Sequence, residues 1–190
     1  GGTPSILSDT HLGRLMETLD RLVPVDKLDE FSFEANPATF TEKKVRFWRS
    51  LGMTRVSLGV QSLDSGILHL LGREHTPAQA LHSVEMLKNA GMAHINMDLM
   101  FAIPGQTLSI WEATLKEAVR AGTDHISAYN LTYEEDTEFF RSLLRGEKRQ
   151  DPDEDASFFE LAEHMLEAAG MRHYETSNYA REGCLSPHNM

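Results

Sequence analysis

The feature that most constrains the fold of this 190-residue chain is a unit that recurs along it. Each copy consists of a capped amphipathic helix, a glycine, about three residues and a short strand. Helices are predicted from residue 8 onward and over 41–52, 76–91, 107–122 and 153–170, with shorter ones over 65–71 and 136–145. Strands are predicted over 31–35, 55–60, 94–101, 125–131 and 172–177. Strands that alternate with helices indicate βαβ units and a mostly parallel sheet.

The ends of the predicted helices carry local signals. Ser8 is a predicted N-cap, and Thr76 with Gln79 forms a predicted capping box. A glycine after each helix suits a left-handed residue at the helix end. In the first helix the apolar residues recur at helical spacing and form one stripe: Leu12, Leu15, Met16, Leu19 and Leu22.

Three successive predicted strands alternate apolar and polar side chains. The polar positions, which share one face of the sheet, are Ser32, Glu34, Ser57, Gly59, Gln61, Asn96 and Asp98. A doubly wound sheet is covered by helices on both faces, and its strands are apolar on both sides. The polar face therefore favours a partial (β/α) barrel with parallel strands inside, helices outside and a polar lumen. Five strands are too few for a closed eight-stranded barrel, which indicates an open barrel or a fragment.

Composition narrows the class of protein. The net charge of −11 argues against a nucleic-acid footprint or an anionic-membrane partner, both of which need clustered Lys and Arg. No apolar run approaches the roughly 18 residues of a membrane span, and no signal-peptide pattern occurs. The simplest expectation is one domain over 1–190 in a reducing, cytoplasmic setting. Since the chain opens on Gly1-Gly2-Thr3 without Met, it is also expected to be a fragment.

Polar residues gather where the predicted strands end, which is the ligand-binding edge of a (β/α) barrel. Glu34 and Asp98 suit hydrogen bonding to a ribose, binding of an ammonium group or general base catalysis, and the alternative is carboxylates satisfied by backbone donors. Gln61 is in a similar position. Arg73 suits a carboxylate or phosphate, or is an ordinary surface residue near a helix end. No Ser/His/Asp order is present, and no catalytic residue is assigned.

Metal-binding residues are not expected in this chain. His94, His125 and His173 each stand at a predicted strand start, the edge of a barrel that contributes to stability, and are expected to be structural. Cys184 is the one cysteine, which excludes an internal disulfide and a cysteine-rich metal site within these residues.

Seven motifs, taken together, are specific. They are Gly1-Gly2-Thr3-Pro4-Ser5, Glu34-Ala35-Asn36-Pro37, Arg55 to Ser62 (RVSLGVQS), Leu71-Gly72-Arg73-Glu74-His75, Asp98 to Thr107 (DLMFAIPGQT), Tyr174 to Ala180 (YETSNYA) and His188-Asn189. In order and spacing the chain resembles the radical S-adenosylmethionine (SAM) family of HemN, the oxygen-independent coproporphyrinogen III oxidase, and HemW, a heme chaperone. The resemblance covers essentially all 190 residues.

The resemblance implies a part-barrel that binds SAM and a [4Fe-4S] cluster. The residues it assigns to SAM are Gly1, Gly2 and Thr3 at the methionine end, Glu34, Gln61, Arg73 and Asp98 along the pocket, and Thr132 near the adenine. In this family a Cys-x3-Cys-x2-Cys loop after the first strand binds the cluster, upstream of the glycine-rich segment. The first strand, those cysteines and a C-terminal domain are therefore expected to lie outside these residues.

The residues of the motifs around Gln61, Arg73 and Tyr174 resemble those of the HemW branch more than those of HemN. That branch implies a heme chaperone that carries heme to respiratory heme proteins, with heme as a further ligand. The HemN branch implies a coproporphyrinogen III dehydrogenase, which decarboxylates its substrate through a 5′-deoxyadenosyl radical. A third hypothesis is a cluster-free (β/α) barrel enzyme acting on a phosphorylated metabolite. Peripheral membrane contact has no support in the sequence.

Overall fold

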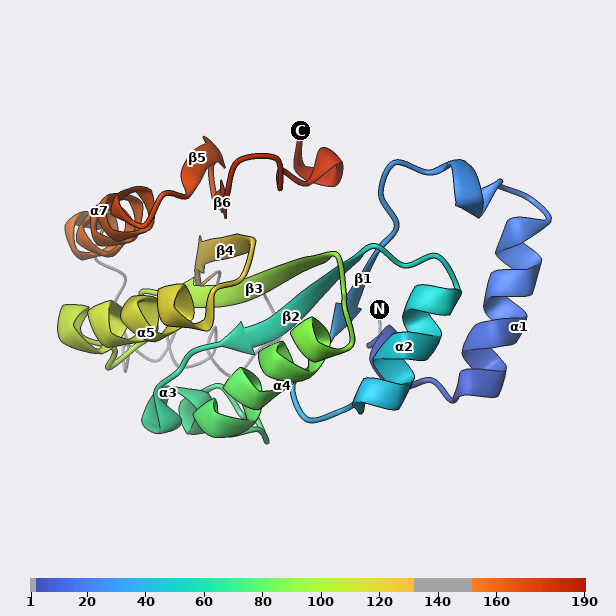
Figure 1. Ribbon diagram of the computed structural model, residues 1–190. Coiled ribbons are helices and arrows are strands. Elements are labelled where there is room, and N and C mark those ends of the chain that lie inside the picture. Colours follow the sequence, from blue (N-terminus) through green and yellow to red (C-terminus); the bar gives the residue numbers. More distant parts are fainter. Residues whose placement is uncertain (1–2, 132–151) are drawn as a thin grey trace.

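The strands form one sheet that is mostly parallel. The computed structural model describes residues 3–131 and 152–190 (Figure 1). In these residues the sheet has the order β1-β2-β3-β4-β6-β5. The strand bounds are β1 Ser32–Ala35, β2 Arg55–Gln61, β3 His94–Phe101, β4 His125–Asn130, β5 Arg172–Glu175 and β6 Asn178–Ala180. β1 to β4 pair in parallel with their chain neighbours, as the alternation of strands and helices predicted.

The far end of the sheet departs from the parallel pattern. The strand predicted over 172–177 ends at Glu175, and the chain turns back into β6, which pairs antiparallel with both β4 and β5. The sequence offered no separate signal for β6, because its three residues are too few to show a period. β6 thus takes the place beside β4 that a continuing parallel barrel would give to a fifth parallel strand.

The helices begin where their caps predicted. Their bounds are α1 Asp9–Asp20, α2 Glu42–Ser50, α3 Ser65–Leu70, α4 Pro77–Asn89, α5 Leu108–Ala121 and α7 Pro152–Ala168, with short 3-10 turns at Pro4–Ile6, Val25–Lys27 and Pro187–Asn189. The N-cap side chains that accept a backbone N–H are Ser8, Thr41, Asp64, Thr76 and Thr107. The glycines that follow α2, α4, α5 and α7 all have positive φ, which confirms the predicted left-handed ends. The helix predicted over 136–145 lies outside the described residues.

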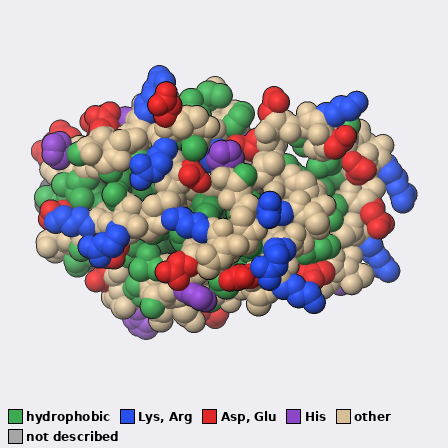
Figure 2. Space-filling model, in the orientation of Figure 1, with side chains coloured by type: hydrophobic (Ala, Val, Ile, Leu, Met, Phe, Trp, Pro, Cys, Tyr) green, Lys and Arg blue, Asp and Glu red, His purple; other side chains and the backbone are tan. Residues whose placement is uncertain are grey.

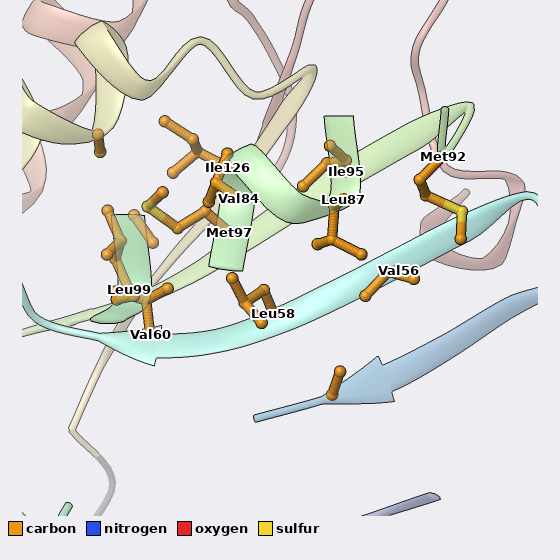
Figure 3. Packing of buried hydrophobic residues seen from close by; sticks show 14 of the residues in the cluster. Val56, Leu58, Val60, Val84, Leu87, Met92, Ile95, Met97, Leu99 and Ile126 are labelled. Atoms are coloured by element: carbon orange, nitrogen blue, oxygen red, sulfur yellow. The ribbon is translucent and has the colours of Figure 1, made fainter. Parts of the chain in front are cut away.

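The apolar core lies between the sheet and the helices that cover its outer face. Figure 3 shows the outward side chains of β2 and β3 packed against α4, with the labelled core residues Val56, Leu58, Val60, Val84, Leu87, Met92, Ile95, Met97, Leu99 and Ile126. Trp111 of α5 is fully buried beside Phe101, and its indole N–H donates to the Phe158 carbonyl at 3.0 Å. This arrangement leaves the other face of the strands free to form the lumen.

Helix α1 covers its side of the sheet incompletely. Of the predicted apolar stripe, Leu12 and Met16 are buried, whereas Leu15 is 46% exposed and Leu22, which lies just after the end of the helix, is 76% exposed. In Figure 1 α1 stands at one end of the row of helices, with α2 between it and edge strand β1. The apolar stripe is therefore only partly covered by the described residues.

The outer surface carries mixed charge. On the face seen in Figure 2, Lys and Arg side chains are interspersed with Asp and Glu. Among the described residues, no helix is both long enough and apolar enough to cross a bilayer.

Candidate functional site

Backbone strain is concentrated at one edge of the sheet. Ala38, Gln61 and Ala102 have φ of 61°, 70° and 55°, a region that L-residues with a side chain adopt rarely. They lie at or just after the carboxyl ends of β1, β2 and β3 respectively. Such conformations cost of order 1–3 kcal/mol each and occur often at ligand-binding sites. This edge is the one at which parallel (β/α) sheets bind their ligands.

A cavity of about 850 Å³ opens on the lumen side of the strands. Its polar wall is formed by Ser32, Glu34, Ser57, Asn96, Asp98, Ser127, Tyr129, Glu175, Ser177 and Asn178, and its apolar wall includes Leu12, Leu15, Met16, Leu19 and Phe33. The polar face inferred from strand alternation is therefore a real surface of the lumen. A cavity of this size is in the range that holds a drug-sized molecule or a cofactor.

Asp98 is a carboxylate of the cavity that side chains from neighbouring strands hold by hydrogen bonds. Its Oδ2 accepts from Ser57 Oγ at 2.8 Å, and its Oδ1 accepts from Asn96 Nδ2 at 2.7 Å. Desolvation in the lumen raises the pKa of Asp98, and the hydrogen bonds from Ser57, Asn96 and Ser127 oppose that rise. The negative charge of Glu34 adds to the rise. Asp98 lies midway along β3, so the candidate site extends into the lumen below the strained rim.

Tyr129 on β4 lies between the strained strand ends at the rim of the site and Asp98 in the lumen. Its hydroxyl donates to Gln61 Oε1 at 2.8 Å, beside the strained end of β2. Burial first, and then the charge of Asp98, raise the pKa of Tyr129 to about 12, so the phenol stays protonated near neutral pH. Tyr129 is not among the predicted site residues. The available signal was its inward position two residues after Ser127 on the same strand.

The structure brings some of the predicted site residues together. Glu34 and Asp98 line one cavity, and Gln61 is buried against Tyr129 at its upper edge. Arg73 is half-buried in the loop after α3, and its charge lowers the pKa of Tyr129, which places it on the same side of the molecule. Its loop is tied to β2 by His75, whose Nε2 contacts the Val60 carbonyl oxygen at 3.1 Å.

The glycine-rich segment is described only from Thr3 onward. Thr3 Oγ1 accepts from Asn36 Nδ2 at 3.0 Å, so the segment lies against the carboxyl end of β1. Gly1, Gly2 and Thr132 lie outside the described residues.

Two of the strand-start histidines make hydrogen bonds within the protein. His125 is buried, and its two ring nitrogens contact Asn96 Oδ1 and the Tyr174 hydroxyl, both at 2.7 Å. Burial lowers the pKa of His125 to about 4. His173 Nδ1 contacts Glu163 Oε1 at 3.2 Å. No group of three or more His, Cys, Asp or Glu side chains that could hold a metal ion occurs within residues 3–131 and 152–190.

Comparison with known proteins agrees with this geometry. The family model described as the radical SAM superfamily matches residues 1–118. The heme chaperone HemW of Bacillus subtilis is 35% identical over 192 residues, which cover 100% of this chain and 51% of that protein. The mitochondrial radical S-adenosyl methionine domain-containing protein 1 of Danio rerio is 35% identical over 191 residues, with 100% and 43% covered. The chain thus spans about half the length of the curated relatives it matches.

Solved structures agree on the fold. Coproporphyrinogen III oxidase (HemN) from Escherichia coli, described as a radical SAM enzyme, superposes with a TM-score of 0.84 at 23% identity, covering 96% of this chain and 42% of that one. The archaeal Elp3 of Methanocaldococcus infernus superposes with a TM-score of 0.70, also at 23% identity, covering 90% and 43%. At these identities the similarity shows the fold alone. That fold is the partial (β/α) barrel that the polar strand face predicted.

Proposed function

This chain belongs to the radical SAM superfamily, and we propose that its lumen binds SAM in a protein that acts as a heme chaperone of the HemW kind. The observation that carries SAM binding is the acidic cavity beneath three strained strand ends. The chaperone role is supported by the full-chain identity of about 35% to proteins named heme chaperone HemW. We further propose that residues 1–190 form one domain.

The charges of the cavity suit a cationic ligand. Glu34, Asp98 and Glu175 contribute carboxylates to its wall. Arg55 also lines it, but this guanidinium is already paired with Glu30, at 2.6 Å. SAM carries a sulfonium and an ammonium group together with ribose hydroxyls, and carboxylates bind cations and accept from hydroxyls. The residues present therefore fit this cofactor.

We assign each predicted residue a part in holding SAM. Glu34 and Asp98 accept hydrogen bonds from its polar groups, and Gln61 presents an amide whose oxygen is already held by Tyr129. Arg73 supplies a cation for the carboxylate. Gly1, Gly2 and Thr3 approach the methionine end, and Thr132 lies near the adenine. The hydrogen bond from Asn36 to Thr3 supports the position of the glycine-rich segment at the carboxyl end of β1.

The superfamily also implies a [4Fe-4S] cluster, which supplies an electron to SAM when bound. Such a cluster needs several cysteine thiolates, and this chain has Cys184 alone, with a pKa that burial raises. These residues therefore do not fit the cluster. From the resemblance, we also propose that the protein is cytoplasmic and that it delivers heme to respiratory heme proteins.

Coproporphyrinogen III dehydrogenase activity is the second candidate. The observation that favours it is the superposition of 96% of the chain on E. coli HemN. Because that likeness shows the fold alone, the two candidates need an experiment that separates them.

The test uses the intact protein, reconstituted with iron and sulfide under anaerobic conditions. Calorimetry should detect SAM binding, and Asp98→Ala should weaken it at least tenfold, since hydrogen bonds to charged groups contribute about 1.5–3 kcal/mol. Glu112→Ala, on the exposed face of α5, is the matched carboxylate control. Unchanged affinity in Asp98→Ala would show that the cofactor lies elsewhere.

The same preparation decides between the two candidates. Stable heme binding, measured by absorbance titration, without consumption of coproporphyrinogen III is the result expected of a chaperone. Turnover of coproporphyrinogen III would contradict the chaperone proposal and favour the dehydrogenase.

A further inference from the structure

Asn96 is the centre of a hydrogen-bond network under Asp98. Its Nδ2 donates to Asp98 Oδ1 at 2.7 Å, and it lies 2.7 Å from Ser57 Oγ, which in turn donates to Asp98 Oδ2. Asn96 Oδ1 accepts from His125. Both ends of the buried amide are therefore used, and the orientation with nitrogen toward the carboxylate is the one that avoids facing two acceptors.

This orientation sets the direction of the hydrogen bonds farther down the lumen. Because Asn96 Oδ1 can only accept, His125 Nδ1 must carry the proton that joins them at 2.7 Å. The ring is neutral near pH 7, so His125 Nε2 is an acceptor and the Tyr174 hydroxyl donates to it. The Tyr174 oxygen then accepts from the Ser186 backbone N–H at 3.3 Å. We call Asn96, His125 and Tyr174 the relay.

The relay ends on a firmly held segment, residues 184–189, which we call the strap. Buried Arg55 donates to the carbonyl oxygens of Cys184 and Leu185, at 3.0 and 3.1 Å. Glu30 accepts from Ser186 Oγ at 2.9 Å while pairing with Arg55. The strap is thus fixed to the amino ends of the strands, and it gives Tyr174 a defined partner.

We propose that the relay positions Asp98: Asn96 holds the carboxylate toward the cavity, and His125 and Tyr174 keep the Asn96 amide from turning over. The relevance to SAM rests on the proposed function. A carboxylate with both oxygens oriented before the ligand arrives loses less freedom on binding than a mobile one. The relay also couples the site to a strap that lies at the opposite end of the strands.

Other groups in the lumen affect the same carboxylate. The charged or titratable side chains that face the cavity with Asp98 are Glu34 on β1, Arg55 on β2, His125 and Tyr129 on β4, Glu175 on β5 and His188 in the strap. A test must therefore change the relay without changing any of these charges, and substitutions at Asn96 and Tyr174 satisfy this condition.

The first measurement follows the carboxyl titration of Asp98 by carbon-13 NMR in the intact protein without SAM. Asn96→Ala removes a donor to the ionised form, so the titration midpoint should rise by about one pH unit. Tyr174→Phe should raise it by a smaller amount, since it releases His125 and through it Asn96. Tyr179→Phe is the matched control: Tyr179 is on the same hairpin, fully buried, with a hydroxyl that has no partner among the described residues.

A midpoint that moves in Asn96→Ala and Tyr174→Phe but stays in Tyr179→Phe supports the relay. A midpoint that stays in all three overturns it, and so does an equal shift in Tyr174→Phe and Tyr179→Phe. If Asn96→Ala does not fold, the two tyrosine variants alone decide.

The second measurement is the SAM dissociation constant from pH 5 to 8. Because Asn96→Ala raises the titration midpoint of Asp98, its affinity for SAM should begin to fall at a pH about one unit higher than in the wild type, in addition to a loss at every pH from the less firmly held carboxylate. If the affinity begins to fall at the same pH in both proteins, Asn96 has a purely structural role and the proposal is contradicted. If the wild type itself does not bind SAM, the proposed function fails, while the titration of Asp98 still decides on the relay.

Discussion

Helices α4 and α1 belong to the same repeated helix–strand unit, yet they differ in how well their apolar residues are covered. Val84 and Leu87 of α4 are almost completely inaccessible to solvent, whereas Leu15 of α1 is 46% exposed and Leu22, just after the end of α1, is 76% exposed. β2 and β3 each have a strand on both sides, and β1 pairs with β2 alone among the described strands. The helix of such a unit therefore buries its apolar stripe only where further elements of the sheet and its helices lie on both sides of it.

The largest effect is expected from the well-covered region. Trp111→Ala should lower the free energy of unfolding by about 3–5 kcal/mol, because it removes a fully buried ring and leaves a cavity beside Phe101. Urea denaturation followed by circular dichroism measures the change. A loss below about 1 kcal/mol would show that this wall is as loosely packed as α1, and the contrast would disappear.

An intermediate effect is expected from pH. The pKa of His125 is about 4 in the folded protein and 6.5 ordinarily, so the unfolded state binds the proton more readily between these values. Its stabilising contribution is present above pH 6.5 and should be lost as pH falls toward 4, by roughly 2–3 kcal/mol. Urea denaturation at several pH values measures the change in the free energy of unfolding over this range.

Hydrogen exchange locates the same effect. Amides of β4 should lose protection with acidification over this window, and those of α1 should change less. His125→Gln should flatten the dependence, and an unchanged slope in that variant would assign the effect to other groups.

The smallest effect is expected at the exposed end of α1. Leu22→Ala should change the free energy of unfolding by no more than about 0.5 kcal/mol, since the side chain is 76% exposed. The same denaturation assay applies, with Leu12→Ala as the matched comparison, since Leu12 is buried on α1 and Leu22 lies just after its end. A loss above 1 kcal/mol at Leu22 would mean that the α1 stripe is covered in the intact protein.

Much of the candidate site followed from strand periodicity. Ser57, Asn96 and Asp98 were placed on one polar face because side chains alternate along a strand, and the cavity confirms that face. Strand periodicity does not predict, however, which of these side chains hydrogen-bond to one another. The partnership of Gln61 with Tyr129 joins residues 68 positions apart, and that of His125 with Tyr174 joins residues 49 apart.

The sequence by itself determined the local features: caps at Ser8 and Thr76, helices that begin near residues 41 and 107, left-handed glycines at the helix ends, and the faces of β1 to β3. Each depends on residues within one or two turns of the chain, whose preferences act before any tertiary contact forms. Only the tertiary structure decided that β6 turns back beside β4, that three of the five residues in the first predicted apolar stripe stay exposed and that the amide nitrogen of Asn96 faces Asp98. These outcomes depend on which distant segments become neighbours and on the hydrogen bonds that buried polar groups must then satisfy.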